Sequence, residues 1–240
     1  MTPPPDFGPT GRCSPNTPPS AGKAGGGVSD MSRLAQHYDR LANAYDRRWR
    51  AYIQQTLERA LDVLKLSGRE RVLDVGCGTG EFERMAMNRF PQLSITGIDV
   101  APQMIAVARD KLADAPRVSF QVAQAEGLPF DQEEFDVVIC ANMLHHVREP
   151  RWALQECARV LRPSGSCVVV DWCRDFWHCR LMHGWLRLVD RTYVKMLRMA
   201  EVRRMAEDLG LRTRKAGRFV AMPLYGMMWC VFEKIVRAPT

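Results

Sequence analysis

The sequence predicts an α/β fold, in which helices cover both faces of a doubly wound, mostly parallel sheet. Three observations favour this fold. Short apolar segments such as 135–140 alternate with segments of helical periodicity through the middle of the chain. The apolar segments lack a polar face, which is typical of strands buried on both sides in a parallel sheet. Prolines and glycines separate the segments, as they do at the ends of helices and strands.

The composition fits one large globular domain. The chain has 240 residues, of which 46% are hydrophobic and 25% charged. No apolar run reaches the ~18 residues that span a membrane. Residues 1–30 are rich in proline, glycine and small polar residues and lack the apolar core of a signal peptide. We expect this segment to be a disordered tail and residues 31–240 to form the domain.

The expected elements follow one another in the order of an α/β sheet. Leucines at helical spacing predict one or two N-terminal helices over residues 32–66. The expected strands cover residues 71–75, 93–98, 118–122, 135–140, 167–170, 211–220 and 224–236. The expected helices between them cover residues 81–90, 102–112 and 152–161, with a long helical insertion, 175–209, after the fifth strand.

The segment from Asp74 to Gly80, D-V-G-C-G-T-G, joins the first strand to the following helix. Its glycines allow a tight turn whose backbone amides can approach a ligand. The spacing is G-x-G-x-G, unlike the G-x-G-x-x-G of dinucleotide-binding turns. Asp74 would repel a pyrophosphate but suits a cation, and Asp99, at the end of the second strand, can accept hydrogen bonds from both hydroxyls of a ribose. S-adenosyl-L-methionine, which is cationic at its sulfur and its amine, has the chemistry that these residues predict.

From about Tyr38 to Asp171 the chain resembles the type-11 branch of class I S-adenosylmethionine-dependent methyltransferases, which includes the quinone C-methyltransferases. The resemblance implies a Rossmann-like, seven-stranded sheet, and it is specific for the cofactor and the fold but not for the substrate. The motifs that carry it appear in family order and at family spacing. They are Tyr45-Asp46, V-L-D-V-G-C-G-T-G at 72–80, G-I-D at 97–99, A-E-G-L-P-F at 125–130, F-D-V-V at 135–138, L-H-H-V at 144–147 and R-V-L-R-P-S-G at 159–165.

The resemblance also implies roles for residues near the glycine turn and the second strand. Gly76, Cys77 and Gly78 would present their backbone to the methionine part of the cofactor. Asp99 would hold the ribose. Two further side chains would flank the adenine, although simple core packing is an equal alternative for the second: Val100 and Met104.

Other positions would complete the cofactor site. Gln124 and Ala125 would lie at the adenine edge, where family members often have an aspartate in place of Gln124; a glutamine oxygen can still accept a hydrogen bond, but without charge. Asn142 would face the methionine end. Tyr38 and Tyr45 would close over the site from the N-terminal helices, or else only pack on the sheet.

Two histidines, His145 and His146, follow the fourth strand, close to where the methyl group would be presented. Either could remove a proton from an acceptor as a general base. The alternative is a structural histidine that bonds a loop carbonyl. Methyl transfer from a sulfonium needs little acid–base help, because positioning and desolvation supply much of the rate.

The excess positive charge lies late in the chain. The net charge is +7, and residues 174–218 hold 12 Lys/Arg and 5 Asp/Glu, a net +7 that leaves the rest of the chain neutral. Tryptophan, leucine and methionine alternate with these cations. Residues 174–210 could therefore form a helical lid or substrate segment, and residues 174–218 a peripheral contact with an anionic membrane, a lid for an acidic substrate or a packed helix with a solvated face. No recognition motif supports nucleic-acid binding.

These patterns predict a cytoplasmic enzyme, with peripheral membrane attachment left open, that transfers a methyl group from S-adenosylmethionine to a small-molecule or lipid-like acceptor. Scattered cysteines beside apolar residues indicate free thiols and a reducing compartment. The spacing of the histidines and cysteines at 173–183 matches no usual zinc pattern, so we expect no metal. The alternatives are a cofactor-binding regulatory or scaffold protein without turnover, and methylation of a macromolecule.

Overall fold

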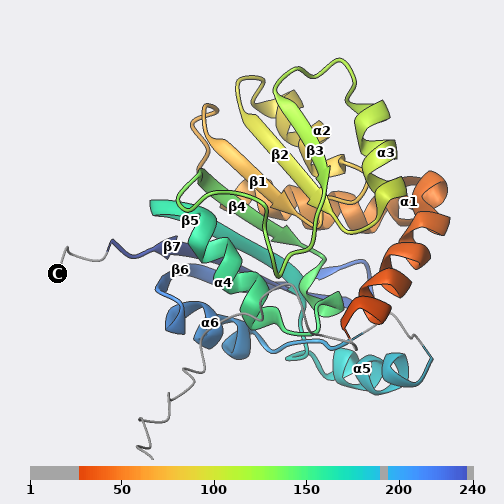
Figure 1. Ribbon diagram of the computed structural model, residues 1–240. Helices are drawn as coiled ribbons and strands as arrows, with labels where there is room; N and C mark the ends of the chain where they lie inside the picture. The colour runs from red at the N-terminus through yellow and green to blue at the C-terminus, as the bar shows by residue number, and fades with distance from the viewer. Residues whose placement is uncertain (1–26, 190–193, 237–240) are drawn as a thin grey trace, which may run out of the picture.

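The computed structural model describes residues 27–189 and 194–236 of the chain. Its centre is a seven-stranded sheet with the order β3-β2-β1-β4-β5-β7-β6 (Figure 1). The first five strands run parallel, whereas β7 pairs antiparallel with both β5 and β6. This confirms the predicted α/β fold with a mostly parallel, seven-stranded sheet. The strands are β1 (Arg71–Val75), β2 (Ser94–Asp99), β3 (Val118–Val122), β4 (Phe135–Ala141), β5 (Leu161–Trp172), β6 (Leu211–Ala221) and β7 (Tyr225–Lys234).

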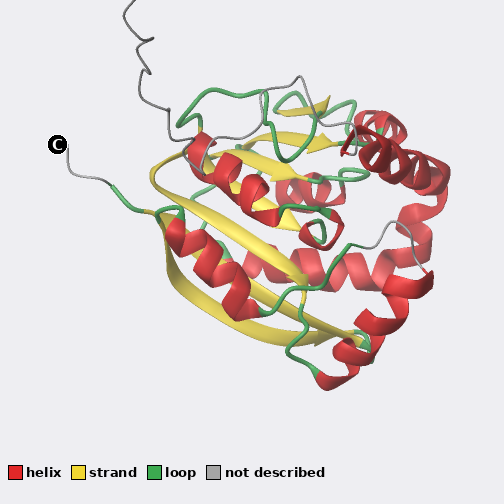
Figure 2. Cartoon of the chain, turned by 60° about the horizontal axis from the view of Figure 1, so that its bottom comes forward, coloured by secondary structure: helices red, strands yellow, loops and turns green. Residues whose placement is uncertain are grey.

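Helices lie on both sides of this sheet (Figure 2). α1 and α2 pack on one face, and α4 and α6 pack on the other. In the part of the chain that the structure describes, no helix combines the length and the apolar character needed to cross a membrane. The helices are α1 (Gly27–Val63), α2 (Glu81–Arg89), α3 (Pro102–Lys111), the short 3-10 helix η1 (Leu144–His146), α4 (Pro150–Val160), α5 (Trp177–Val189) and α6 (Met199–Asp208).

The central strand β4 shows why the apolar strands fit this architecture. Val138 joins Leu154 of α4 in the core on one face, and the next residue, Ile139, joins Leu57 of α1 in the core on the other face. Successive residues of a strand point to opposite faces, so both must be apolar where both faces are covered. Burying each side chain stabilises the fold by roughly 1.5–3 kcal/mol. This packing fixes the carboxyl end of the strand, where the site lies.

The N-terminal helix starts earlier than predicted. α1 is one continuous helix, and it begins at Gly27, inside the segment 1–30 for which we predict disorder. Residues 1–26 lie outside the described residues. β5 is also longer than the predicted strand 167–170, because its irregular first part already pairs with β4 through Leu161.

The helical stretch predicted over residues 175–209 is wrong as a single element. It is divided into α5 and α6, and the described residues between them, 194–198, are not helical. The amides of Val194 and Lys195 both donate to the carbonyl of His145, over 3.2 Å each. Helical periodicity cannot reveal this return, because the acceptor comes from a loop about fifty residues earlier in the chain.

Candidate functional site

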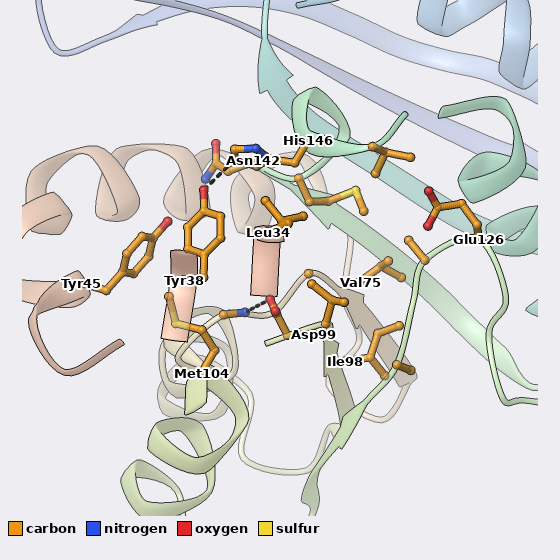
Figure 3. Close-up of a pocket in the computed structure, with 17 residues that line it drawn as sticks. Leu34, Tyr38, Tyr45, Val75, Ile98, Asp99, Met104, Glu126, Asn142 and His146 are labelled. Carbon is orange, nitrogen blue, oxygen red and sulfur yellow. Dashed lines mark hydrogen bonds between the residues drawn. The ribbon is translucent and has the colours of Figure 1, made fainter. Parts of the chain in front are cut away.

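A cavity opens where the chain reverses its direction along the sheet. β1 and β4 are neighbours there, although β2 and β3 lie between them in sequence. Such a reversal leaves a crevice beyond the carboxyl ends of the strands. The cavity has an empty volume of about 680 Å³ and is lined by residues that follow β1, β2 and β4, by α1 and by η1 (Figure 3). Because this volume includes space open to solvent, the lining residues, and not the volume, indicate which ligand the cavity suits.

The glycine turn after β1 forms one side of the cavity. Gly76 and Gly78 have positive φ angles of 81° and 55°, in the left-handed region that favours glycine. A Cβ atom at Gly76 would lie 2.7 Å from the Cβ atom of Met143, whereas a Cβ atom at Gly78 would meet no atom within 4 Å. Gly76 is therefore required by close packing, and Gly78 leaves bare backbone facing open space.

Asp99 ends β2 beside this turn. Its carboxylate accepts hydrogen bonds from the backbone N–H groups of Gly78, over 3.0 Å, and of Ala101, over 2.9 Å (Figure 3 draws the first). Each oxygen keeps a lone pair for a further donor. Burial raises the pKa of this carboxyl above its ordinary value, against the lowering effect of the backbone N–H groups of Ala101, Gly78 and Val100. The side chain is thus held rigidly at the cavity wall with accepting capacity left over.

Asp74 lies deeper, in an adjoining cavity of about 430 Å³ that shares Gly76, Gly78 and two other residues with the first. It is 2% exposed, and its Oδ1 atom finds no hydrogen-bond partner among the described residues. Burial and the nearby Asp99 raise the pKa of Asp74 to about 8. A second buried carboxyl, Glu83 on α2, also lacks partners for both oxygens, and burial together with Asp74 raises its pKa. Burial thus favours the neutral form of both acids, although Lys111 partly opposes this at Glu83, and a positive charge placed beside Asp74 would stabilise its carboxylate.

Three residues predicted near the adenine, or next to one so predicted, differ in their positions. Met104 is 1% exposed and packs against Ala42 of α1, so it both lines the cavity and belongs to the core. Gln124 is exposed and does not line the cavity; its carbonyl accepts the N–H of Gly127 in a tight turn. Glu126 lines the cavity instead, with a buried Oε2 atom that has no partner among the described residues. Burial raises the pKa of the Glu126 carboxyl.

α1 forms the other wall. Tyr38 and Tyr45 are seven residues apart, and this spacing puts both on one face of the helix. Their rings meet edge to face at 5.9 Å. The hydroxyl of Tyr38 lies 2.6 Å from Nε2 of His146 (Figure 3). A phenol and an imidazole from distant parts of the chain are thereby paired at the edge of the cavity.

Asn142 fastens α1 to the sheet. It directly follows β4 with φ 56°, in the left-handed region that asparagine tolerates. Its Oδ1 accepts from the hydroxyl of Tyr52 over 2.7 Å, and its Nδ2 donates to the hydroxyl of Thr56 over 2.8 Å. The indole N–H of Trp172 donates to the same Tyr52 oxygen over 2.6 Å. One acceptor site and one N–H of the Asn142 amide are therefore used by α1, and the residue borders both cavities.

The two histidines after β4 have different surroundings. His145 is 5% exposed; its Nδ1 lies 2.7 Å from Oδ1 of Asp171, and its ring stacks on Trp172 with centroids 4.4 Å apart. It does not line the cavity, whereas His146 does. The catalytic role predicted for either histidine is therefore geometrically open only to His146. The contacts of the buried His145 hold the loop between β4 and α4 against β5.

Most of the predicted site residues come together. Ten of the fourteen line the main cavity, Asp74 and Cys77 line the adjoining one, and Gln124 and His145 line neither. Sequence reasoning missed Leu34 and Glu126 in the lining and Tyr52, Thr56 and Glu83 around it. Glu126 stands inside the motif A-E-G-L-P-F and could have been found there. The ten residues are Tyr38, Tyr45, Gly76, Gly78, Asp99, Val100, Met104, Ala125, Asn142 and His146.

Comparison with known proteins identifies relatives of the central part of the chain. Residues 72–165 match the Methyltransf_25 family, described as a methyltransferase domain. The chain is 34% identical over 153 residues to the ubiquinone/menaquinone biosynthesis C-methyltransferase UbiE of Geobacter sulfurreducens, covering 60% of this chain and 57% of that protein. It is 36% identical over 146 residues to the demethylmenaquinone methyltransferase of Thermus thermophilus, covering 59% and 63%. The chain thus spans less than two thirds of the length of these relatives.

Solved structures share the fold at low sequence identity. A SAM-dependent methyltransferase from Thermotoga maritima has a TM-score of 0.67 at 19% identity, with 82% of this chain and 98% of that chain covered. The [4+2]-cyclase SpnF has a TM-score of 0.65 at 20% identity, with 76% and 81% covered. A cyclase among these structures illustrates that the fold alone does not determine the reaction.

The family match contains most of the cavity lining but not the part that α1 contributes. It includes the glycine turn, Asp99 and η1, but leaves out α1, α5 and α6. The matched segment has the predicted motifs that lie between residues 72 and 165, and it contributes β1 to β4 and the start of β5 to the sheet. Residues 72–165 are therefore similar in sequence to a methyltransferase domain, and the fold is shared with solved SAM-dependent methyltransferases.

Proposed function

We propose that the chain transfers the methyl group of S-adenosylmethionine to a small apolar acceptor that carries an ionisable hydroxyl or acidic carbon, of which a quinol is the leading candidate. One observation carries this proposal: a single cavity joins carboxylates and bare backbone at the strand ends to the pair Tyr38–His146 on the other side. The relatives named for ubiquinone and menaquinone biosynthesis support the acceptor class.

The residues on the sheet side fit the cofactor. Asp74, with its unpartnered oxygen, would pair with the ammonium group, and Asp99 would accept from the ribose hydroxyls. Val100 and Met104 would enclose the adenine, and Glu126 would take the accepting role predicted for Gln124 at its edge. When bound, the cofactor supplies a methyl group activated by its sulfonium.

The residues on the α1 side fit an acceptor. Leu34, Met143 and Val147 give the cavity apolar lining that excludes water. Nε2 of His146 can receive the proton that leaves the acceptor through the Tyr38 hydroxyl bonded to it, because an imidazole is the side chain best suited to that task near neutral pH. The Tyr38 hydroxyl, 2.6 Å from this nitrogen, would hold the ring in place or relay the proton.

The region after β5 completes this proposal. A lipid-like acceptor is most directly delivered from a membrane, so we also propose that residues 174–218 contact a membrane surface peripherally. The region has the net charge of +7 that an anionic surface attracts.

The test is methyl transfer by the purified chain from isotope-labelled S-adenosylmethionine to a panel of quinols, phenols and aliphatic lipids. We expect S-adenosylhomocysteine and a methylated quinol to form in equal amounts, and His146→Asn to slow both without weakening S-adenosylhomocysteine binding. Tight cofactor binding with no turnover on any acceptor would instead support the alternative of a regulatory protein. Transfer to protein or RNA in a fractionated extract, and not to the panel, would support methylation of a macromolecule.

A further inference from the structure

Helix α5 exposes a row of large apolar side chains. Trp177, Leu181, Trp185 and Leu188 are 72%, 69%, 61% and 85% exposed. Their spacing of four, four and three residues places them on one side of the helix, within an arc of about 80°. Large apolar side chains on a protein surface normally stand alone, so a continuous row marks an interaction site.

This row, here called the α5 stripe, is separate from the side of the helix that packs on the protein. Cys179 is fully buried, and with Met196 it forms a core cluster to which Met182 and Leu186 add partly buried contacts. The Cys179 thiol lies 3.7 Å from the carbonyl of Gly226 at the start of β7. The inner side therefore fixes the helix, and the stripe faces outward. Figure 1 shows α5 at the periphery of the molecule.

The turn between β6 and β7 adds to this apolar surface. Val220, Met222 and Leu224 are 49%, 38% and 66% exposed. The start of α5 lies against the same hairpin, because Phe176 fills the space beside Gly226 and the guanidinium of Arg218 lies 5.9 Å from the Phe176 ring. Of the ten large apolar side chains exposed in the described part of the chain, seven therefore belong to α5 and this adjoining turn.

The charge around the stripe indicates what covers it. The sequence of α5 contains two arginines and no acidic residue. Arg180, Arg198 and Arg218 are exposed on or near the helix. A second copy of the chain would bring a region of net charge +7 against itself, which like-charge repulsion opposes. Tryptophans and leucines bordered by arginines are instead typical of helices that lie in the interface of an anionic bilayer.

We propose that α5 docks on an anionic membrane, with the α5 stripe inserted below the phosphate groups and the neighbouring arginines paired with them. This deepens the proposed function, since it names the lipid chemistry that residues 174–218 would meet. Val194 and Lys195, after α5 in the chain, donate to the carbonyl of His145, the neighbour of His146 in the cavity lining. Docking would hold the cavity close to the surface that stores an apolar acceptor.

The test is co-sedimentation of the full chain with vesicles of phosphatidylcholine alone or mixed with phosphatidylglycerol. We expect binding to the anionic vesicles, and at least about tenfold weaker binding for Leu181→Ser/Trp185→Ser. The matched control is Val122→Ser/Val236→Ser, which removes two exposed apolar side chains outside α5 and the turn, 46% and 60% exposed; it should bind as the unaltered chain does.

Three results would overturn the inference. The stripe variant and the control would bind vesicles equally, or neutral vesicles would bind the chain as tightly as anionic ones. The third result is that the unaltered chain and the control bind no vesicles and form an oligomer in sedimentation velocity, whereas the stripe variant does not form this oligomer. Calorimetry with S-adenosylhomocysteine on the same proteins separates this failure from failure of the proposed function, since both variants leave the cavity intact.

Discussion

The sheet side and the α1 side of the cavity are built from different groups. At the strand ends, the cavity is bordered by the bare backbone of Gly78 and by buried carboxylates such as Asp99. Across from them, α1 and η1 contribute rings and apolar groups, chiefly Tyr38, Leu34 and His146. The first side suits the recognition of a charged, hydroxyl-rich ligand, and the second suits a less polar one that must lose a proton.

The two sides also differ in how the chain positions them. Gly78 and Asp99 follow adjacent strands whose backbones are hydrogen-bonded in register. The pair Tyr38–His146 joins residues 108 apart in sequence, and α1 is held in place by the bonds of Asn142 to Tyr52 and Thr56. The residues of the sheet side are thus positioned by the hydrogen bonds between strands, and those of the α1 side by the packing of a helix on the sheet. Changes on the first side should affect cofactor binding, and changes on the second should affect turnover.

The largest effect is expected on the sheet side. Asp99→Ala should weaken S-adenosylhomocysteine binding at least about 100-fold, because it removes hydrogen bonds from two donors to a charged acceptor. Calorimetry measures this directly. Asp99→Asn keeps the shape of the side chain but not its charge. Its affinity should lie between that of Asp99→Ala and that of the unaltered chain. Equal affinity of all three folded proteins would show that Asp99 does not bind the cofactor.

On the α1 side, His146→Asn should lower kcat by about 100-fold while leaving S-adenosylhomocysteine affinity within about threefold. Initial rates with a saturating quinol measure the first, and calorimetry the second. Tyr38→Phe should show the same pattern with a smaller loss, since it removes only the partner of the imidazole. A parallel loss of binding in His146→Asn would show that the two sides are not separable.

His145→Ala should act on stability rather than on chemistry. It leaves the buried carboxylate of Asp171 without its imidazole partner, and the free energy of unfolding should fall by about 1–3 kcal/mol. Denaturant unfolding measures this change, with His146→Asn as the control expected to unfold nearly as the unaltered chain does. A normal stability with lost turnover in His145→Ala would reverse the roles of the two histidines.

A smaller effect, with a defined pH dependence, comes from Asp74. Burial and Asp99 raise the pKa of its carboxyl to about 8 in the cofactor-free protein, and a bound ammonium group would lower it again. Binding should therefore release a proton, and affinity for S-adenosylmethionine should rise between about pH 6 and pH 8, above which the ammonium group itself loses its proton. Calorimetry in two buffers of different ionisation enthalpy measures the number of protons released on binding. Asp74→Asn should abolish this release.

The same pKa predicts the stability of the free protein with the opposite sign. A carboxyl whose pKa is raised on folding contributes stability that is fully present below its unfolded pKa and is lost as pH rises through about 8. Asp74→Asn should thus raise Tm at alkaline pH, by on the order of 2–4 °C. A flat pH profile in the unaltered chain would contradict the neutral state of the buried acids.

The smallest effect separates two neighbours at the adenine end. Gln124→Ala should leave affinity within about twofold, because Gln124 is exposed and outside the cavity. Glu126→Gln should weaken binding by several-fold, since its buried oxygen has no other partner among the described residues. Competition with labelled cofactor resolves differences of this size. If Gln124→Ala lost more affinity than Glu126→Gln, the adenine contact predicted for Gln124 would be supported instead.

The residues of the sheet side could be predicted from the sequence more fully than those around α1. The glycine turn and Asp99 could be predicted because each stands in a short, contiguous motif at the end of a strand. Glu83 gave no such signal: its position on α2 looks like any acidic residue of a helix, and only the packing of the sheet shows it buried beside Asp74. Thr56 and Tyr52 were missed because their partner, Asn142, is about ninety residues away. α5 and α6 were merged because the segment that divides them is held by long-range hydrogen bonds.

The most direct test of the two-sided cavity is a crystal structure of the full chain with S-adenosylhomocysteine. We expect the ribose hydroxyls within hydrogen-bond distance of Asp99, the amine beside Asp74, and the sulfur facing Tyr38 and His146. A ligand bound elsewhere, or one bound at Asp99 with its sulfur turned away from α1, would contradict the assignment of one side to the methyl donor and the other to the acceptor.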